Sequence, residues 1–359
     1  MMSLAIVMHI EHLYGSYAIA GFALGAETIG AAISGPLLAR WMGPWGMRRV
    51  LLIAAVVSAS AMAALALVPM SSLLAIGCSL IMGLTSPPIQ SAARSIYPLI
   101  IDKKHLSRVF SLDATSQEIL WIAGPLLATI LAAQISTGFG VLFMTAVQLI
   151  GISLFCINRE VGEVKITKPT GKVGRVLKNQ TVLVNAILGL LLIGTFGGIE
   201  VGTVAIFDKT IAGATIAALS VGSILGGLTL GPRAKTKWAL TKFLLLTAIG
   251  MALVLINPTN AIWVSICLFI AGLGVAPALG VLAATLSVSL KPSETAEAYG
   301  WSGTGQLMGY AAGAALSGIA IDSVSAESSL FIALVFALAT LAVAMMSANL
   351  NPSTGKAKK

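Results

Sequence analysis

The chain contains 359 residues, of which 57% are hydrophobic and only 10% are charged. An average soluble domain carries about 25% charged residues, because its exposed faces need polar cover. This composition excludes a soluble globular protein and predicts one that lies mostly in lipid. The formal charge of +9 is carried by short clusters of Lys and Arg between apolar runs. The chain therefore lacks the basic stripe typical of a protein that binds nucleic acid.

Long apolar runs predict an all-α polytopic membrane protein. A hydrocarbon core about 30 Å thick needs roughly 20 apolar residues per helix, and continuous apolar runs favour helices over the alternating strands of a barrel. Eleven full transmembrane helices are expected, near residues 17–41, 50–68, 72–97, 108–133, 139–157, 181–206, 210–231, 238–256, 260–289, 297–321 and 328–349. Residues 1–13 are apolar but too few to cross a bilayer alone, and we interpret them as a partial first helix, truncated at its cytoplasmic end.

The basic residues indicate the orientation. Nearly all of them lie in alternate loops and in the C-terminal tail, and Lys and Arg accumulate in cytoplasmic loops of membrane proteins. We therefore expect a multi-pass membrane protein with the basic loops and the C-terminus in the cytoplasm. The high net charge then reflects the orientation of the protein in the lipid bilayer.

Part of the first half of the chain recurs in the second half. A shift of 189 residues places Gly83 on Gly272, Pro88 on Pro277, Thr115 on Thr304, Gln117 on Gln306, Trp121 on Tyr310 and Gly124 on Gly313. A shift of 192 residues places Gly30 on Gly222 and Gly35 on Gly227. Transporters are often built from such repeats. We expect two pseudo-symmetric six-helix bundles, at residues 1–157 and 181–350, joined by a cytoplasmic linker at 158–180 and followed by a cytoplasmic tail at 351–359.

Three motifs resemble those of the major facilitator superfamily. The loop after the first full helix reads Gly35-Pro-Leu-Leu-Ala-Arg-Trp-Met-Gly43-Pro-Trp-Gly46-Met-Arg48-Arg49, with Gly43 where the family usually has an Asp. Gly124-Pro125 matches the core of the family's antiporter motif. The run Pro87-Pro88-Ile-Gln-Ser-Ala-Ala-Arg94, followed by Gln117-Glu118, is similar to an efflux-like branch common in actinobacteria.

This resemblance implies a secondary transporter that works by alternating access between two helix bundles. Its implied activity is proton-coupled efflux, or antiport, of a small organic compound, without a cofactor and as a monomer. It also implies gating or structural roles for the motif residues, namely Gly35, Arg48, Arg49, Gly124 and Pro125.

Three glutamates lie away from the ends of predicted spans, where an ionisable side chain costs about 2.5–3.5 kcal/mol at the helix centre and usually faces an interior cavity. Burial raises the pKa of a carboxyl group, which lets it exchange a proton near neutral pH. Glu27, Glu118 and Glu200 are therefore candidates for proton coupling. The alternative is a protonated Glu that bonds neighbouring helices together.

Polar and aromatic residues at matched repeat positions suggest a substrate cavity. Gln117 and Trp121 lie one turn apart, as do Gln306 and Tyr310, so each pair shares a helix face. Such a face suits an amphipathic organic substrate, although the rings could equally pack against lipid or neighbouring helices. Separately, Arg94 and Asp113 lie near the cytoplasmic ends of neighbouring helices, which suggests a gate or a structural latch.

Enzyme motifs are missing from the sequence. It has no P-loop, its three histidines lack metal-ligand spacing, and no His/Asp set is placed to activate a Ser or Thr. The expected function is therefore transport and not catalysis. Two alternatives remain open: a proton-coupled importer or uniporter of a nutrient, and a non-transporting relative of the family.

Overall fold

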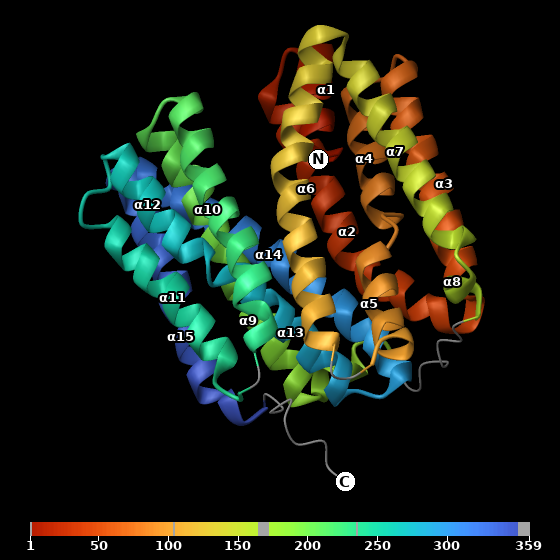
Figure 1. Cartoon of the computed structure of the whole chain (residues 1–359). Helices are drawn as coiled ribbons and strands as arrows, with labels where there is room; N and C mark the ends of the chain where they lie inside the picture. The colour runs from red at the N-terminus through yellow and green to blue at the C-terminus, as the bar shows by residue number, and fades with distance from the viewer. Residues whose placement is uncertain (1, 103–104, 164–171, 235, 351–359) are drawn as a thin grey trace. The chain divides into compact units, whose positions relative to one another are not determined.

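The computed structural model describes residues 2–102, 105–163, 172–234 and 236–350, and these ranges consist of helices and short connections (Figure 1). The α-helices are α1 (Met2–Tyr14), α2 (Tyr17–Trp45), α3 (Met47–Leu67), α4 (Ser72–Leu84), α5 (Ile89–Ile100), α6 (Leu106–Gln134), α7 (Thr137–Ile157), α8 (Arg159–Glu163), α9 (Gln180–Ile206), α10 (Lys209–Thr229), α11 (Ala239–Val254), α12 (Ala261–Gly272), α13 (Val275–Ser289), α14 (Pro292–Ser323) and α15 (Ser328–Met346). The 3-10 helices are η1 (Arg175–Lys178), η2 (Gly231–Arg233) and η3 (Ala348–Leu350).

Polar caps explain where several of these helices begin. The side-chain oxygen of the capping residue accepts a hydrogen bond from a backbone N–H of the first turn, which has no partner within the helix. The capping residues of α2, α4, α7, α9 and α12 are Ser16, Ser71, Ser136, Asn179 and Asn260. Each one lies within three residues of the start of a predicted span, so these apolar runs start as helices near the points that the sequence predicts.

Eight helical stretches of the described chain are long and apolar enough to cross a membrane. They are Ile19–Trp45, Met47–Leu67, Ser72–Ile100, Thr137–Ile157, Gln180–Ile206, Ile211–Thr229, Ala261–Ser289 and Ser328–Met346. The helix α11 is apolar but shorter, and α6 and α14 carry more polar residues. These stretches indicate a multi-pass membrane protein, whereas the predicted count of eleven full helices plus a partial one is not confirmed.

The chain forms two compact units. Unit 1 contains Met1–Leu99, Leu120–Arg175 and Lys291–Thr304, and unit 2 contains Ile100–Ile119, Val176–Leu290 and Gly305–Lys359. The start of α6 therefore belongs to unit 2, and the start of α14 belongs to unit 1. Each unit takes one helical segment from the other half of the sequence.

Two predicted spans are interrupted at equivalent places. The run near residues 72–97 forms α4 and α5, which are separated at residues 85–88. The run near 260–289 forms α12 and α13, which are separated at residues 273–274. Pro87 and Pro88 lack the N–H that would continue the first helix, and the shift of 189 residues superimposes Gly83-Leu84 on Gly272-Leu273 at the two breaks.

In unit 1, the backbones of α2 and α4 lie in direct contact at two glycines. A Cβ on Gly83 would overlap the carbonyl oxygen of Glu27. A Cβ on Gly30 would lie only 2.8 Å from the carbonyl oxygen of Leu80. Ser34 Oγ also donates a hydrogen bond to the Gly83 carbonyl oxygen, over 2.8 Å. Close approach of this kind requires small residues.

Unit 2 repeats these contacts between α10 and α12. A Cβ on Gly272 would overlap the carbonyl oxygen of Leu219, and a Cβ on Gly222 would overlap that of Phe269. Adding 192 to the α2 positions and 189 to the α4 positions of unit 1 gives the residue numbers of both contacts in unit 2. The sequence repeat is therefore also a repeat of specific interhelical contacts.

The helix α1 packs against α2 and α7 within unit 1. Ile6 and Ile10 are fully buried, and His9 is only 4% exposed. The His9 ring places Nδ1 3.0 Å from Thr137 Oγ1 and Nε2 3.2 Å from the carbonyl oxygen of Leu65. A buried His with both ring nitrogens engaged fits a structural role in holding α1 in place.

Candidate functional site

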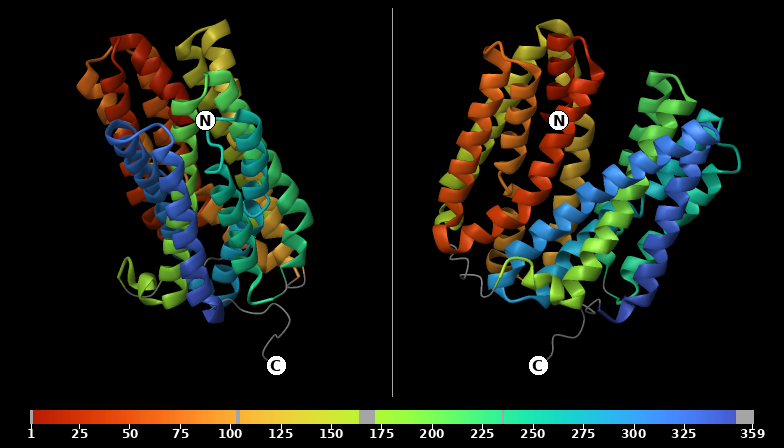
Figure 2. Two further views of the ribbon diagram at one scale, coloured as in Figure 1. Left: turned by 90° about the vertical axis from the view of Figure 1, so that its left-hand side faces the viewer. Right: turned by 180° about the vertical axis from the view of Figure 1, so that it is seen from behind.

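Backbone contact between α9 and α14 in unit 2 positions the candidate site. Three glycines of α14, spaced by four residues, lie on one face of the helix, and a Cβ on any of them would crowd a carbonyl oxygen of α9. These contacts pair Gly305 with Ala186, Gly309 with Leu190 and Gly313 with Gly194. The two helices consequently lie directly next to each other (Figure 2), with no room for a side chain between them at these points.

Glu200 of α9 and Tyr310 of α14 meet beside this contact. The Tyr310 hydroxyl donates a hydrogen bond to Glu200 Oε2 over 2.6 Å. The two residues line a cavity of about 390 Å³ together with Val201, Val204 and Ala205, which share one face of α9. Glu200 is accessible from outside the protein, and Tyr310 is half-buried. The site therefore combines one acid and one phenol with apolar walls.

The hydrogen bond between the two side chains fixes the orientation of the Glu200 carboxyl group. The carboxylate form of Glu200 accepts the hydrogen bond from Tyr310, which orients Oε2 in the cavity. An ionised carboxyl is costly where water is excluded. The Tyr310 hydroxyl thus gives the Glu200 carboxyl group a polar partner within a largely apolar cavity.

A second charged site lies at the start of α14, in unit 1. Arg40 Nη1 is 2.6 Å from Glu297 Oε2, and the two side chains are 13% and 4% exposed. Glu297 Oε1 accepts further hydrogen bonds from the N–H of Gly174, over 2.8 Å, and from Trp301 Nε1–H, over 3.4 Å. Gly174 has a φ of 78°, a conformation that favours glycine. This carboxylate thus joins α2 and the linker to α14.

The sequence did not single out this ion pair. Arg40 and Glu297 are 257 residues apart, and neither repeat shift relates them. One signal was present, since Glu297 is the only acid within the predicted span 297–321. An acid just inside an apolar helix suggests a buried partner, and Arg40, which lies within α2, supplies it.

The predicted Arg94–Asp113 latch involves residues of different units and stays a prediction. Arg94 is buried, and its guanidinium lies 5.9 Å from the centre of the Tyr299 ring, within reach of a cation–π interaction. Asp113 Oδ2 accepts a hydrogen bond from Gln117 Nε2 over 3.1 Å. Gln117, predicted to line a cavity, is thus held by an acid one turn away.

Besides the Glu200–Tyr310 pair, the described candidates are distributed over both units. Glu27 is half-buried on α2 in unit 1, and Gln306 is half-buried on α14 in unit 2. The candidates whose side chains lie outside the described part of the structure are Glu118, Trp121 and Pro125. Among the residues that are described, no group of three or more His, Cys, Asp or Glu could hold a metal ion.

The residues of the Gly/Arg-rich loop have local structural contacts. Arg48 donates a hydrogen bond to the carbonyl oxygen of Asn158, over 2.8 Å, just after α7 ends. A cation at this end of a helix satisfies carbonyl groups that have no partner within it. A Cβ on Gly35 would lie 3.8 Å from the nearest backbone oxygen of α14. Arg49 is exposed and Gly124 is buried.

The Major Facilitator Superfamily sequence model matches residues 1–231, which is more than half of the chain. The chain belongs to this superfamily. No curated protein sequence matches it. Membership of an efflux-like branch of the superfamily, which the motifs around Arg94 and Gln117 suggested, stays a prediction.

Solved structures of transporters share the fold of this superfamily member. The human organic anion transporter MFSD10 (TETRAN) is similar over 96% of this chain and 97% of that one, with 14% identity and a TM-score of 0.75. The Escherichia coli fucose:proton symporter FucP is similar over 96% of each chain, with 10% identity and a TM-score of 0.73. A bacterial homologue of the iron transporter ferroportin, in an outward-facing state, is similar over 96% of each chain, with 12% identity and a TM-score of 0.70.

Proposed function

We propose that this protein is a proton-coupled secondary transporter that exports a small organic compound by alternating access. The observation that carries the proposal is the Glu200–Tyr310 pair, which offers one proton-binding oxygen beside a cavity of about 390 Å³. Membership of the superfamily and the transporter neighbours support a transport function. The FucP structure adds a precedent for proton coupling in this fold.

In this mechanism, Glu200 binds a proton at Oε2 when the cavity is open to water. Neutralising the carboxylate lowers the cost of excluding water from the site, so the protonated state favours closure. Release of the proton on the other side restores the carboxylate and its hydrogen bond from Tyr310. Glu27 and Glu118 are proposed as further proton-linked acids.

The substrate class follows from the walls of the cavity. Val201, Val204 and Ala205 are apolar, and the Tyr310 ring adds an aromatic surface. This lining suits an amphipathic organic molecule, which can place its apolar part against the walls and a polar group near Glu200. Gln117, Trp121 and Gln306 are proposed as additional lining residues.

The proposed setting is a bacterial inner membrane, in which the protein acts as a monomer. The basic loops and the C-terminal tail face the cytoplasm in this proposal, because Lys and Arg concentrate on that side. Proton flow into the cell would then drive the substrate outward.

Transport by purified protein in proteoliposomes tests the proposal. A panel of ethidium, antibiotics, sugars and amino acids is first screened for compounds that raise the melting temperature, because a ligand of the folded state stabilises it. The most stabilising compound is then used as the transport probe. We expect an imposed pH gradient to drive its accumulation by the unaltered protein, and we expect Glu200→Gln to abolish this drive.

Asp322→Asn is the matched control, since Asp322 is an exposed acid at the end of α14 in the same unit. It should leave pH-driven transport unchanged. Tyr310→Phe should retain transport with a shifted pH profile, because it removes only the hydrogen bond to Glu200. Unaltered coupling in Glu200→Gln, Glu27→Gln and Glu118→Gln would exclude proton coupling by these acids, and accumulation in the opposite direction would identify an importer.

A further inference from the structure

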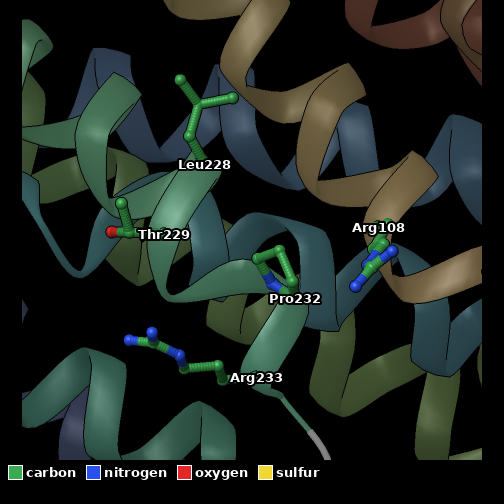
Figure 3. A pocket seen from close by; sticks show the side chains of 5 residues that line it. All are labelled: Arg108, Leu228, Thr229, Pro232 and Arg233. Atoms are coloured by element: carbon green, nitrogen blue, oxygen red, sulfur yellow. The ribbon is translucent and has the colours of Figure 1, made fainter.

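A second cavity of unit 2 is lined by two arginines. It has a volume of about 470 Å³, and its lining residues are Arg108, Leu228, Thr229, Pro232 and Arg233. Figure 3 shows Arg108 at the start of α6 and the other four residues at the end of α10 and in η2. Both arginines are exposed, so their side chains can turn toward a bound group.

The sequence repeat relates this cavity to the buried ion pair of unit 1. The shift of 189 residues places Glu297 on Arg108, and the shift of 192 residues places Arg40 on Pro232, beside Arg233. The carboxylate of unit 1 therefore has a guanidinium as its counterpart in unit 2. Because Arg233 is next to Pro232, the counterpart of Arg40, unit 2 has two arginines near the place where unit 1 has an Arg and a Glu.

Neighbouring contacts support this equivalence. In unit 1, a Cβ on Gly300 would crowd the backbone around Gly35, where α14 crosses α2. In unit 2, Ser111 Oγ donates a hydrogen bond to the carbonyl oxygen of Gly227 over 2.6 Å, where α6 crosses α10. The shift of 189 residues makes Gly300 equivalent to Ser111, and the shift of 192 residues makes Gly35 equivalent to Gly227. The crossing of α14 with α2 in unit 1 therefore recurs as the crossing of α6 with α10 in unit 2.

No acid of the described chain neutralises the arginines of unit 2. Among its described lining residues, this cavity has no Asp or Glu, in contrast to the Arg40–Glu297 ion pair of unit 1. Residues 209–290 contain neither of these acids. Asp102 and Asp113 belong to the start of unit 2 but do not line the cavity. Two unneutralised guanidinium groups create a positive potential that favours an anion.

We propose that this cavity binds a phosphate group, which takes the place that the Glu297 carboxylate has in unit 1. The planar guanidinium of Arg matches the oxygens of a phosphate with paired hydrogen bonds. Leu228 and Pro232 add an apolar surface that can contact the carbon atoms next to the phosphate. The phosphate comes either from the headgroup of an anionic phospholipid or from a soluble phosphate compound, and the inference does not depend on the proposed transport activity.

Binding to the purified full-length protein in detergent tests this inference. The melting temperature is measured while dihexanoyl phosphatidylglycerol, or separately inorganic phosphate, is added at constant ionic strength. We expect at least one of them to stabilise the protein with a saturable dependence. The variant Arg108→Gln/Arg233→Gln should weaken that binding by about tenfold or more, because each arginine supplies a charge-assisted hydrogen bond.

The matched control is Lys237→Gln/Lys242→Gln, which removes the same charge from exposed lysines of the same unit outside the cavity. Its affinity should stay within about twofold of the unaltered protein, as expected for surface charges away from a binding site. Stabilisation by phosphatidylglycerol alone identifies a lipid headgroup, and equal stabilisation by inorganic phosphate identifies a soluble compound. The inference is wrong if neither probe binds, or if the two double variants bind equally. Arg108→Lys/Arg233→Lys keeps the charge and serves as the test variant if the glutamine pair does not fold.

Discussion

Removal of the Glu297 carboxylate should destabilise the protein by about 3 kcal/mol. Glu297 is 4% exposed and Arg40 is 13% exposed, so Glu297→Gln removes the carboxylate charge next to a largely buried guanidinium. Breaking a buried ion pair from one side costs about 3–5 kcal/mol, and we take the lower end because Gln still accepts one hydrogen bond. The bonds from Gly174 and Trp301 weaken as well, since their acceptor loses its charge.

A double-mutant cycle measures this interaction directly. The free energy of unfolding is determined by denaturant titration in detergent micelles for Arg40→Met, Glu297→Leu and the double variant. Because paired apolar replacements avoid an isolated buried charge, the double variant should lie within about 2 kcal/mol of the unaltered protein. The coupling energy should therefore be about 3 kcal/mol or more.

Glu294→Gln is the control, because Glu294 lies in the first turn of the same helix. It removes the same charge but no buried pair, so it should cost less than about 1 kcal/mol. If Glu297→Gln costs no more than Glu294→Gln, or if the two single effects simply add in the double variant, the buried pair does not stabilise unit 1.

Two further predictions concern helix packing and the titration of one exposed acid. Gly309→Ala should cost about 1–3 kcal/mol of unfolding free energy, because its Cβ overlaps the Leu190 carbonyl oxygen, whereas Gly303→Ala meets nothing within 4 Å and should be neutral or slightly stabilising. Glu327 lies between α14 and α15, and a hydrogen bond from Ser325 lowers its pKa. Its contribution to stability is thus present above the ordinary pKa of Glu and is lost as the pH falls through the lowered value. Ser325→Ala should raise the pKa in a carbon NMR titration, and an unchanged pKa would exclude this hydrogen bond as the cause.

Apolar runs were sufficient to place most helices, because lipid exposure demands continuous apolar sequence over a known length. The run predicted at 181–206 is found as α9 at Gln180–Ile206, and that at 139–157 as α7 at Thr137–Ile157. The interruption after α4 was not predicted, since hydropathy reports exposure to lipid and does not report the hydrogen bonds that Pro87 and Pro88 cannot make.

The candidate sites were less accessible to prediction, because they depend on which helices cross. Glu200 and Tyr310 were both singled out from the sequence, but for different roles, and their hydrogen bond follows from the backbone contact between α9 and α14. Arg40 resembled an ordinary cytoplasmic arginine until the start of α14 placed Glu297 beside it. Residue type and predicted depth in the membrane suggested a role for single residues. The partner of each residue becomes visible only once the packing of the helices is known.

The contact between α2 and α4 in unit 1 recurs between α10 and α12 in unit 2. The effect of a substitution in one half of the chain therefore predicts the effect at the equivalent position in the other half. Gly83 and Gly272 contact equivalent backbone atoms in their own units, so a substitution that is rejected at one should be rejected at the other for the same steric reason. A saturation library over residues 20–125 therefore provides a reference profile for residues 212–314. Positions at which the two profiles diverge would reveal side chains with different roles in the two halves, and Arg108 with its counterpart Glu297 is the first such position to compare.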